Sequence, residues 1–151
     1  ERQGRGIEYT ELVDGLHFTA CAFALPAGAR LPMHDHPNMT VFSRVLWGEL
    51  EVQSFDKAPF ASSPDTGLGG LAGLLGRASI FSPFPVTPVL EREVWTAAAG
   101  TQTTLPDHGN IHEFRALTPC CVVDVLGPPY DAAQRRRCTY YEVERRRDGP
   151  A

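Results

Sequence analysis

Two histidines separated by a single residue are the first feature of the chain that could do chemistry. His34 and His36 lie in the stretch LPMHDHPN, between Pro32 and Pro37. Each proline fixes its own φ angle and biases the preceding residue toward extended backbone. In an extended segment, residues i and i+2 point to the same side, so both imidazoles could bind one metal ion. The alternative is a pair of surface histidines in a loop, which the spacing alone leaves open.

A metal ion held by only two side chains would be bound weakly, and His112 is the predicted third ligand. It lies in LPDHGNIHEF, where it follows a turn rich in Pro, Gly and Asn and enters a segment with strand character. His108 is the competing candidate, but it lies inside the turn beside Gly109, where a side chain usually faces water. His17 precedes a predicted strand and is expected to be structural or exposed.

Four further residues are candidates for the same pocket. Asp124 interrupts the apolar run CCVVDVL, and a carboxylate buried on a strand needs a partner. It is either a structural residue bonded to a backbone group or an Arg, or an acid that faces the metal pocket. Tyr130 follows two prolines, which could hold its hydroxyl over the pocket or simply pack its ring in a turn. Cys138 and Tyr140 are i and i+2 in the strand predicted at 138–144, so they share a face, where both could also merely pack.

The composition predicts one globular domain with its own core. The chain has 151 residues, of which 42% are hydrophobic, and a net charge of −4. The acidic balance argues against a nucleic-acid partner, and no run is long and apolar enough for a membrane-spanning helix. The start ERQGRG shows no apolar leader, and the four cysteines form no CxxC pair, which argues against a zinc knuckle. Their pattern favours a reducing compartment.

Short apolar or alternating segments separated by turn residues predict an all-β chain. No helix longer than about two turns stands out, and such a pattern favours an antiparallel barrel or sandwich. Residues 57–78, rich in Gly, Ala, Ser and Pro, predict a long loop or insertion, and residues 145–151 predict a frayed tail. We therefore expect a single domain over 1–151 with its core at about 7–144. The strands are expected at residues 16–25, 40–48, 49–55, 120–126 and 138–144.

Two short motifs resemble those of the cupin family, which implies a double-stranded β-helix, or jelly-roll barrel. The residues that match are Gly28, His34, His36 and Gly48 for the first motif, and Pro106, Gly109 and His112 for the second. Cupins usually carry a glutamate a few residues after the histidine pair, where this chain has Thr40 and Val41. The resemblance therefore implies three histidine ligands without an acid, which is characteristic of the thiol dioxygenases.

Longer blocks resemble one branch of those enzymes, the plant cysteine oxidases and the related 2-aminoethanethiol (cysteamine) dioxygenase. The blocks are HDHPNMTVFSRVLWGELEVQSFD, GNIHEFRALTPC, VVDVLGPPYD and CTYYEVE. The resemblance implies iron(II) at His34, His36 and His112, with O2 as co-substrate and a functional acid at Asp124. Some relatives form a thioether between a Cys and a Tyr, which would place a crosslink at Cys138 and Tyr140.

The chemistry of this residue set agrees with that implication. Three neutral imidazoles leave the full positive charge on iron(II), which favours an anionic thiolate. Three protein ligands on one face leave positions open for a substrate sulfur and O2, which would then meet in a fixed orientation. The expected product is a sulfinic acid that carries both oxygen atoms.

The leading interpretation is an oxidase of N-terminal cysteine in proteins or peptides, which couples protein lifetime to oxygen through the N-degron pathway. We expect a monomer in the cytoplasm, the nucleus or both. The same chemistry on cysteamine is the first alternative. A metal-binding cupin module without turnover is the second, and a zinc or nickel cupin isomerase is a weaker third, because three histidines do not select iron uniquely.

Overall fold

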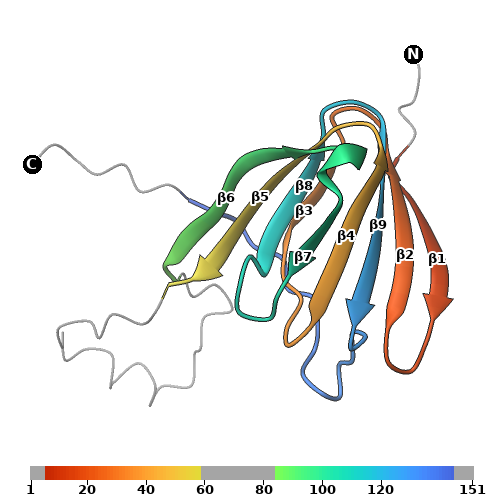
Figure 1. Ribbon diagram of the computed structural model, residues 1–151. Coiled ribbons are helices and arrows are strands. Elements are labelled where there is room, and N and C mark those ends of the chain that lie inside the picture. Colours follow the sequence, from red (N-terminus) through yellow and green to blue (C-terminus); the bar gives the residue numbers. More distant parts are fainter. Residues whose placement is uncertain (1–5, 59–83, 145–151) are drawn as a thin grey trace, which may run out of the picture.

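The computed structural model describes residues 6–58 and 84–144, which form two antiparallel β-sheets packed face to face (Figure 1). The five-stranded sheet has the order β1-β2-β9-β4-β7, and the four-stranded sheet has the order β3-β8-β5-β6. The first sheet contains β1 (Glu8–Asp14), β2 (Thr19–Leu25), β4 (Thr40–Trp47), β7 (Thr101–Thr104) and β9 (Cys120–Gly127). The second contains β3 (Arg30–His34), β5 (Leu50–Lys57), β6 (Val86–Trp95) and β8 (Ile111–Ala116). The predicted all-β, antiparallel class is confirmed.

Most of the predicted strands correspond to observed ones. The predictions at 40–48, 49–55 and 120–126 match β4, β5 and β9 closely. The prediction at 16–25 begins too early, since β2 starts at Thr19. A tight turn precedes it, in which the Gly15 N–H donates to the Phe18 carbonyl at 3.0 Å.

The prediction of a strand at 138–144 is wrong. This segment makes only an isolated bridge between Tyr140 and His34, and its backbone is tied to the histidine segment by single hydrogen bonds. Cys138 and Tyr141 are half-buried, whereas Thr139 and Tyr140 between them are exposed, so burial does not alternate along this segment. The loop predicted at 57–78 lies almost entirely outside the described residues, and the tail predicted at 145–151 lies fully outside them.

The core lies between the two sheets and is built from the inward-facing residues of each strand. In β9, alternate residues are buried, and Asp124 is the charged member of that inward set. The main apolar cluster joins both sheets around Trp95 and Phe114, whose rings lie 5.8 Å apart between centroids. This packing fixes the distance between the sheets and so holds the inward-facing polar residues in place.

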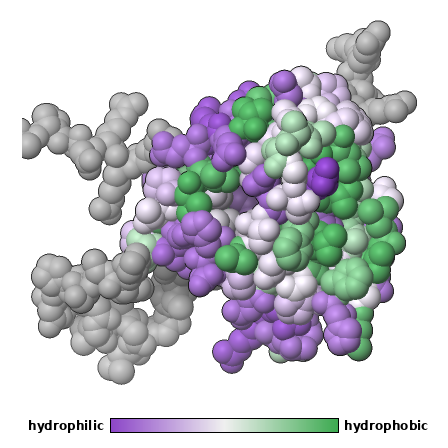
Figure 2. Space-filling model, viewed as in Figure 1, coloured by the Kyte–Doolittle hydropathy of each residue, from purple (hydrophilic) through white to green (hydrophobic). Residues whose placement is uncertain are grey.

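Part of the outer surface is hydrophobic. Figure 2 shows hydrophobic side chains gathered where β9, β2 and β1 lie in Figure 1. Tyr9 on β1 and Phe42, Leu46 and Trp47 on β4 are each about half exposed. Within the described residues, no helix has the length and apolar character needed to cross a membrane.

Candidate metal centre

The structure brings His34, His36 and His112 together. Strands β3 and β8 pair in antiparallel fashion with His34 opposite His112, and His36 follows the end of β3. One ring nitrogen from each residue lies within 4.8 Å of the others, and the ring centroids are 4.8 to 4.9 Å apart. The sequence predicted that His34 and His36 share a face and that His112 is the third ligand. The pairing of β3 with β8 brings His112 beside them.

Burial keeps all three imidazoles neutral, which is the form that binds metal. Burial is the main cause that lowers the pKa of His36, and the nearby His112 and His34 lower it further, to about 2. Burial and the nearby His34 lower the pKa of His112 to about 3, although backbone contacts with Gly109 and Asn110 oppose the shift. Burial also lowers the pKa of His34. Three clustered neutral rings therefore present lone pairs at neutral pH.

Hydrogen bonds select the ring nitrogen that two of these histidines leave free. His34 donates its Nδ1 proton to the Pro32 carbonyl at 2.8 Å, which leaves Nε2 with its lone pair. The Tyr130 hydroxyl donates to the Asp35 carbonyl at 2.9 Å, so it accepts the Nδ1 proton of His36, 2.6 Å away. A ligand histidine is commonly oriented by such a bond through its other nitrogen.

The remaining nitrogens show that the residues fit a metal ion. The Nε2 atom of His36 and the Nδ1 atom of His112 are buried and have no hydrogen-bond partner among the described residues. A buried polar atom without a partner is costly, and a bound cation would relieve that cost. An all-imidazole set suits iron, zinc, copper or nickel.

The structure places Tyr130, Cys138 and Tyr140 beside the histidines. The Tyr130 ring is 5.5 Å from that of His36, and the Tyr140 ring is 6.3 Å from that of His34. The Cys138 thiol contacts both tyrosine hydroxyls, and burial raises its pKa. Tyr140 itself is 68% exposed, so this side of the site is open to solvent. All three residues border the histidine group, as the sequence suggested, and their roles stay predictions.

Asp35, between the two histidines of HDH, is a residue whose role the sequence analysis missed. Its carboxylate is buried and accepts hydrogen bonds from the Thr139 N–H at 2.8 Å and the Tyr141 hydroxyl at 2.7 Å. Its own N–H donates to the Thr139 carbonyl at 3.1 Å. Asp35 thus holds the segment that carries Cys138 against the histidine segment. Nothing in the sequence signals this pairing, because its partners are more than one hundred residues away.

The turn before His112 is anchored separately. Asp56 accepts the Gly109 N–H at 2.6 Å and contacts His108 Nδ1 at 3.2 Å. Asn110 accepts the His36 N–H at 2.9 Å and donates to the His36 carbonyl at 3.0 Å. His108 is exposed and pairs with Asp56 outside the histidine group, in agreement with its place in the turn. His17 is also exposed.

Asp124 faces inward from the opposite sheet. It is 5% exposed, and its neighbours in register are Cys21 on β2 and Ser43 on β4. Burial raises the pKa of Asp124 to about 6, and the Ser43 hydroxyl opposes the shift. Across the described residues, no hydrogen bond or ion pair joins its carboxylate to the three histidines. The acid is therefore buried and partly protonated near neutral pH. Its two predicted roles, as a structural residue and as an acid that faces the metal pocket, stay predictions.

Comparison with known proteins finds a family model and named relatives that match most of the chain. Residues 1–150 match the PCO_ADO family model. Plant cysteine oxidase 2 of Arabidopsis thaliana is 35% identical over 89% of this chain and 44% of its own length. The 2-aminoethanethiol dioxygenase of Homo sapiens is 30% identical over 91% of this chain and 52% of its own length. The chain thus spans about half the length of the curated relatives it matches.

A solved structure with a similar fold supports the predicted architecture. A Klebsiella pneumoniae protein with a double-stranded β-helix domain superimposes with a TM-score of 0.50 at 12% identity, covering 95% of this chain and 90% of that one. At this identity the likeness concerns the fold alone. The predicted cupin fold is confirmed.

Proposed function

The chain belongs to the PCO_ADO family, and on that premise we propose that it is an iron(II)-dependent thiol dioxygenase that oxidises an N-terminal cysteine of proteins or peptides to cysteine sulfinic acid. The observation that carries the proposal is the cluster of three neutral imidazoles, half-buried His34 with buried His36 and His112, with no carboxylate among them. Relatives named for the oxidation of cysteine and of 2-aminoethanethiol support a thiol substrate and O2 as co-substrate.

The protein's own residues prepare the site for this reaction. Pro32 and Tyr130 fix the rings of His34 and His36, so their free nitrogens converge without rearrangement. Iron(II) held there would supply positive charge that stabilises a substrate thiolate and a place where O2 can react with its sulfur. No carboxylate of the described residues belongs to the histidine group, so the three ligands themselves would cancel none of that charge.

The side of the site bordered by Tyr130, Cys138 and Tyr140 is the proposed substrate entrance. Tyr130 and Tyr140 are 38% and 68% exposed, so a peptide could reach the histidines from there. An N-terminal cysteine offers a thiol and an amine on adjacent carbons, and hydroxyl groups at the rim could bind that amine. The blocks LGPPY and CTYY favour the protein-directed branch over the small-thiol branch.

The wider role follows from this substrate. An oxidase of N-terminal cysteine would couple the lifetime of its target to oxygen through the N-degron pathway, and we propose that it acts as a monomer in the cytoplasm or nucleus. Its similarity to the human 2-aminoethanethiol dioxygenase favours cysteamine as the second candidate substrate.

The decisive experiment loads the protein with iron(II) without oxygen and then exposes it to air with a peptide that begins with Cys. Mass spectrometry should show the addition of two oxygen atoms, and a matched peptide with the Cys moved inside should stay unchanged. Cysteamine is tested in parallel. Oxidation of cysteamine alone would assign the chain to the small-thiol branch. Retention of iron without oxidation of either thiol would reduce it to a metal-binding cupin module.

A further inference from the structure

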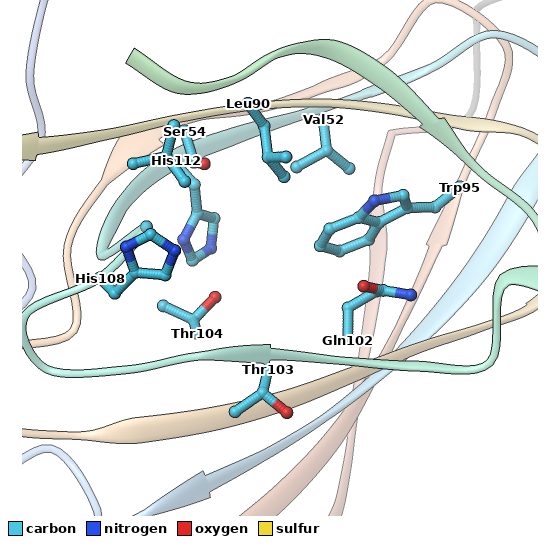
Figure 3. A pocket seen from close by; sticks show the side chains of 11 residues that line it. Val52, Ser54, Leu90, Trp95, Gln102, Thr103, Thr104, His108 and His112 are labelled. Atoms are coloured by element: carbon cyan, nitrogen blue, oxygen red, sulfur yellow. The ribbon is translucent and has the colours of Figure 1, made fainter. Parts of the chain in front are cut away.

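A cavity of about 190 Å³ lies between β5, β6 and β7 and contains buried polar atoms that lack partners. Figure 3 shows Ser54, Thr104, Gln102 and Trp95 around it, with His112 at the opposite end from Trp95. Ser54 Oγ and Trp95 Nε1 are buried and have no hydrogen-bond partner in the described part of the chain. An apolar cavity stays dry, whereas a cavity with several such groups is suited to hold water.

Two rows of side chains end at this cavity, one from each sheet. In the four-stranded sheet, His112 lies opposite His34 on one side and Ser54 on the other. His112 and Ser54 both line the cavity. The cavity is therefore continuous with the wall of the metal centre.

The second row crosses the five-stranded sheet. Asp124 on β9 lies opposite Ser43 on β4, and Ser43 lies opposite Gln102 on β7. Gln102 lines the same cavity as His112, so the strand register links Asp124, through Ser43, to a residue that borders this cavity. Gln102 donates its Nε2 proton to the Ala99 carbonyl at 2.8 Å, so its Oε1 atom is left as an acceptor facing the cavity.

Ser43 lies between Asp124 on β9 and Gln102 on β7 in the register of the sheet. It is 2% exposed, and its hydroxyl contacts the Asp124 carboxyl, whose pKa it lowers against the larger effect of burial. A hydroxyl can accept one proton while it donates its own. The neighbour on the other side of Asp124 is Cys21, and burial together with Asp124 raises the pKa of that thiol to about 12. Cys21 stays protonated, and its strand β2 lies on the side of β9 that faces away from β7 and the cavity.

We propose that Asp124, Ser43 and water held in this cavity form the path by which a proton leaves the site in each turnover. The proposal rests on the proposed function, since oxidation of a thiol by O2 yields a sulfinate and one proton (RSH + O2 → RSO2⁻ + H⁺). Asp124 accepts the thiol proton and passes it to Ser43 Oγ. Ser43 at the same time releases its own proton to water beside Gln102. His108, exposed at the outer end of the cavity, marks the exit to solvent.

The first test needs neither metal nor substrate. At about pH 5 the Asp124 carboxyl is protonated, because burial raises its pKa to about 6. Its infrared C=O band is assigned by its loss in Asp124→Asn. After transfer to D2O, Ser43→Ala should slow the deuterium shift of that band by about 10²-fold, the low end for loss of a positioned proton-transfer group. Ser43→Thr, which keeps the hydroxyl, should restore it. An unchanged rate in a folded Ser43→Ala protein would overturn the path.

The second test uses the iron-loaded enzyme. Ser43→Ala should lower kcat with little change in the KM for the peptide, and it should raise the solvent isotope effect on kcat. Adding Ser43→Ala to Asp124→Asn should cause no further loss, since both act on one path. If the losses of kcat in the two single variants multiplied in the double variant, the proposal would be contradicted. If the wild-type protein oxidises no thiol, the proposed function fails, and the exchange measurement still decides whether the path exists.

Discussion

The identity of the free nitrogen on each imidazole is set by a single hydrogen bond. Pro32 holds His34, and Tyr130 holds His36, with the Nδ1 proton engaged in both cases. Both rings therefore offer Nε2 to the centre of the cluster. His112 has no such bond in the described residues, and its place depends on the β8 backbone and on the turn before it.

Replacing His112 with Ala should remove stoichiometric metal. Two imidazoles would remain, and a site with two protein ligands binds metal weakly. Metal analysis after anaerobic loading and desalting measures the loss. His108→Ala is the matched control, because His108 lies in the same turn but pairs with Asp56. Full metal content in the His112 variant would show that the third ligand lies elsewhere.

Replacing Tyr130 with Phe should weaken metal binding about 10- to 100-fold, the usual cost of losing a group that orients a ligand histidine. The phenyl ring fills the same space, but His36 loses the partner that fixes its Nδ1 proton. Competition with a chelator of known affinity gives the change in Kd. Tyr9→Phe, on exposed β1, should leave the Kd unchanged. Equal affinities in both variants would limit Tyr130 to a packing role.

At the scale of elements, the segment from Cys138 to Tyr141 is a docked strap rather than a strand. Backbone bonds from Asp35 to Thr139 and from Tyr141 to Met33 hold it to the histidine segment. Asp35 adds two side-chain bonds to the same strap. The wall that contains Cys138 is therefore held by two backbone hydrogen bonds and by the two that the buried Asp35 carboxylate accepts.

Replacing Tyr141 with Phe should lower the free energy of unfolding by about 1–3 kcal/mol, because the buried Asp35 carboxylate loses a hydrogen-bond donor. Urea denaturation of the metal-free protein measures the change. Tyr140→Phe is the same substitution one position away, on a side chain that is 68% exposed, and it should change stability by less than about 0.5 kcal/mol. Similar effects at the two positions would mean that Asp35 gains little from Tyr141.

A strand with one buried face is easier to predict from the sequence than a strand whose residues are all exposed. Strands β4, β5 and β9 lie inside their sheets, where one face is buried, so composition or alternation reveals them. Strand β1 is an edge strand with every residue exposed, and no comparable pattern marks it. The HDH spacing and the approach of His112 could be predicted from the sequence. The partners of Asp35 could not, because they depend on docking between distant segments.

At the scale of the whole molecule, the buried histidines make metal-free stability depend on pH. The pKa of His36 is lowered to about 2 and that of His112 to about 3, against an ordinary value of 6.5. Between about pH 3 and 6.5 the unfolded chain binds protons that the folded chain excludes, so stability falls as the pH falls. Asp124 acts in the opposite direction between about pH 4 and 6, because its pKa is raised to about 6. Two histidines outweigh one acid.

The melting temperature of chelator-treated protein should therefore drop as the pH is lowered from about 7 to 4.5. His36→Gln removes one of the excluded protons and should flatten the dependence. Asp124→Asn removes the opposing group and should make it steeper. A melting temperature that stays constant or rises on acidification would contradict this account.

The long-range support of the histidines also sets when the site can be completed during synthesis. Tyr130 lies 94 residues after His36, and Tyr141 lies 106 residues after Asp35. A nascent chain that has emerged from the ribosome only through His112 contains all three imidazoles but none of these distant supports. Domains fold as units once their long-range contacts can form. The three imidazoles therefore gain their full set of supporting contacts only after the chain has been translated through Tyr141.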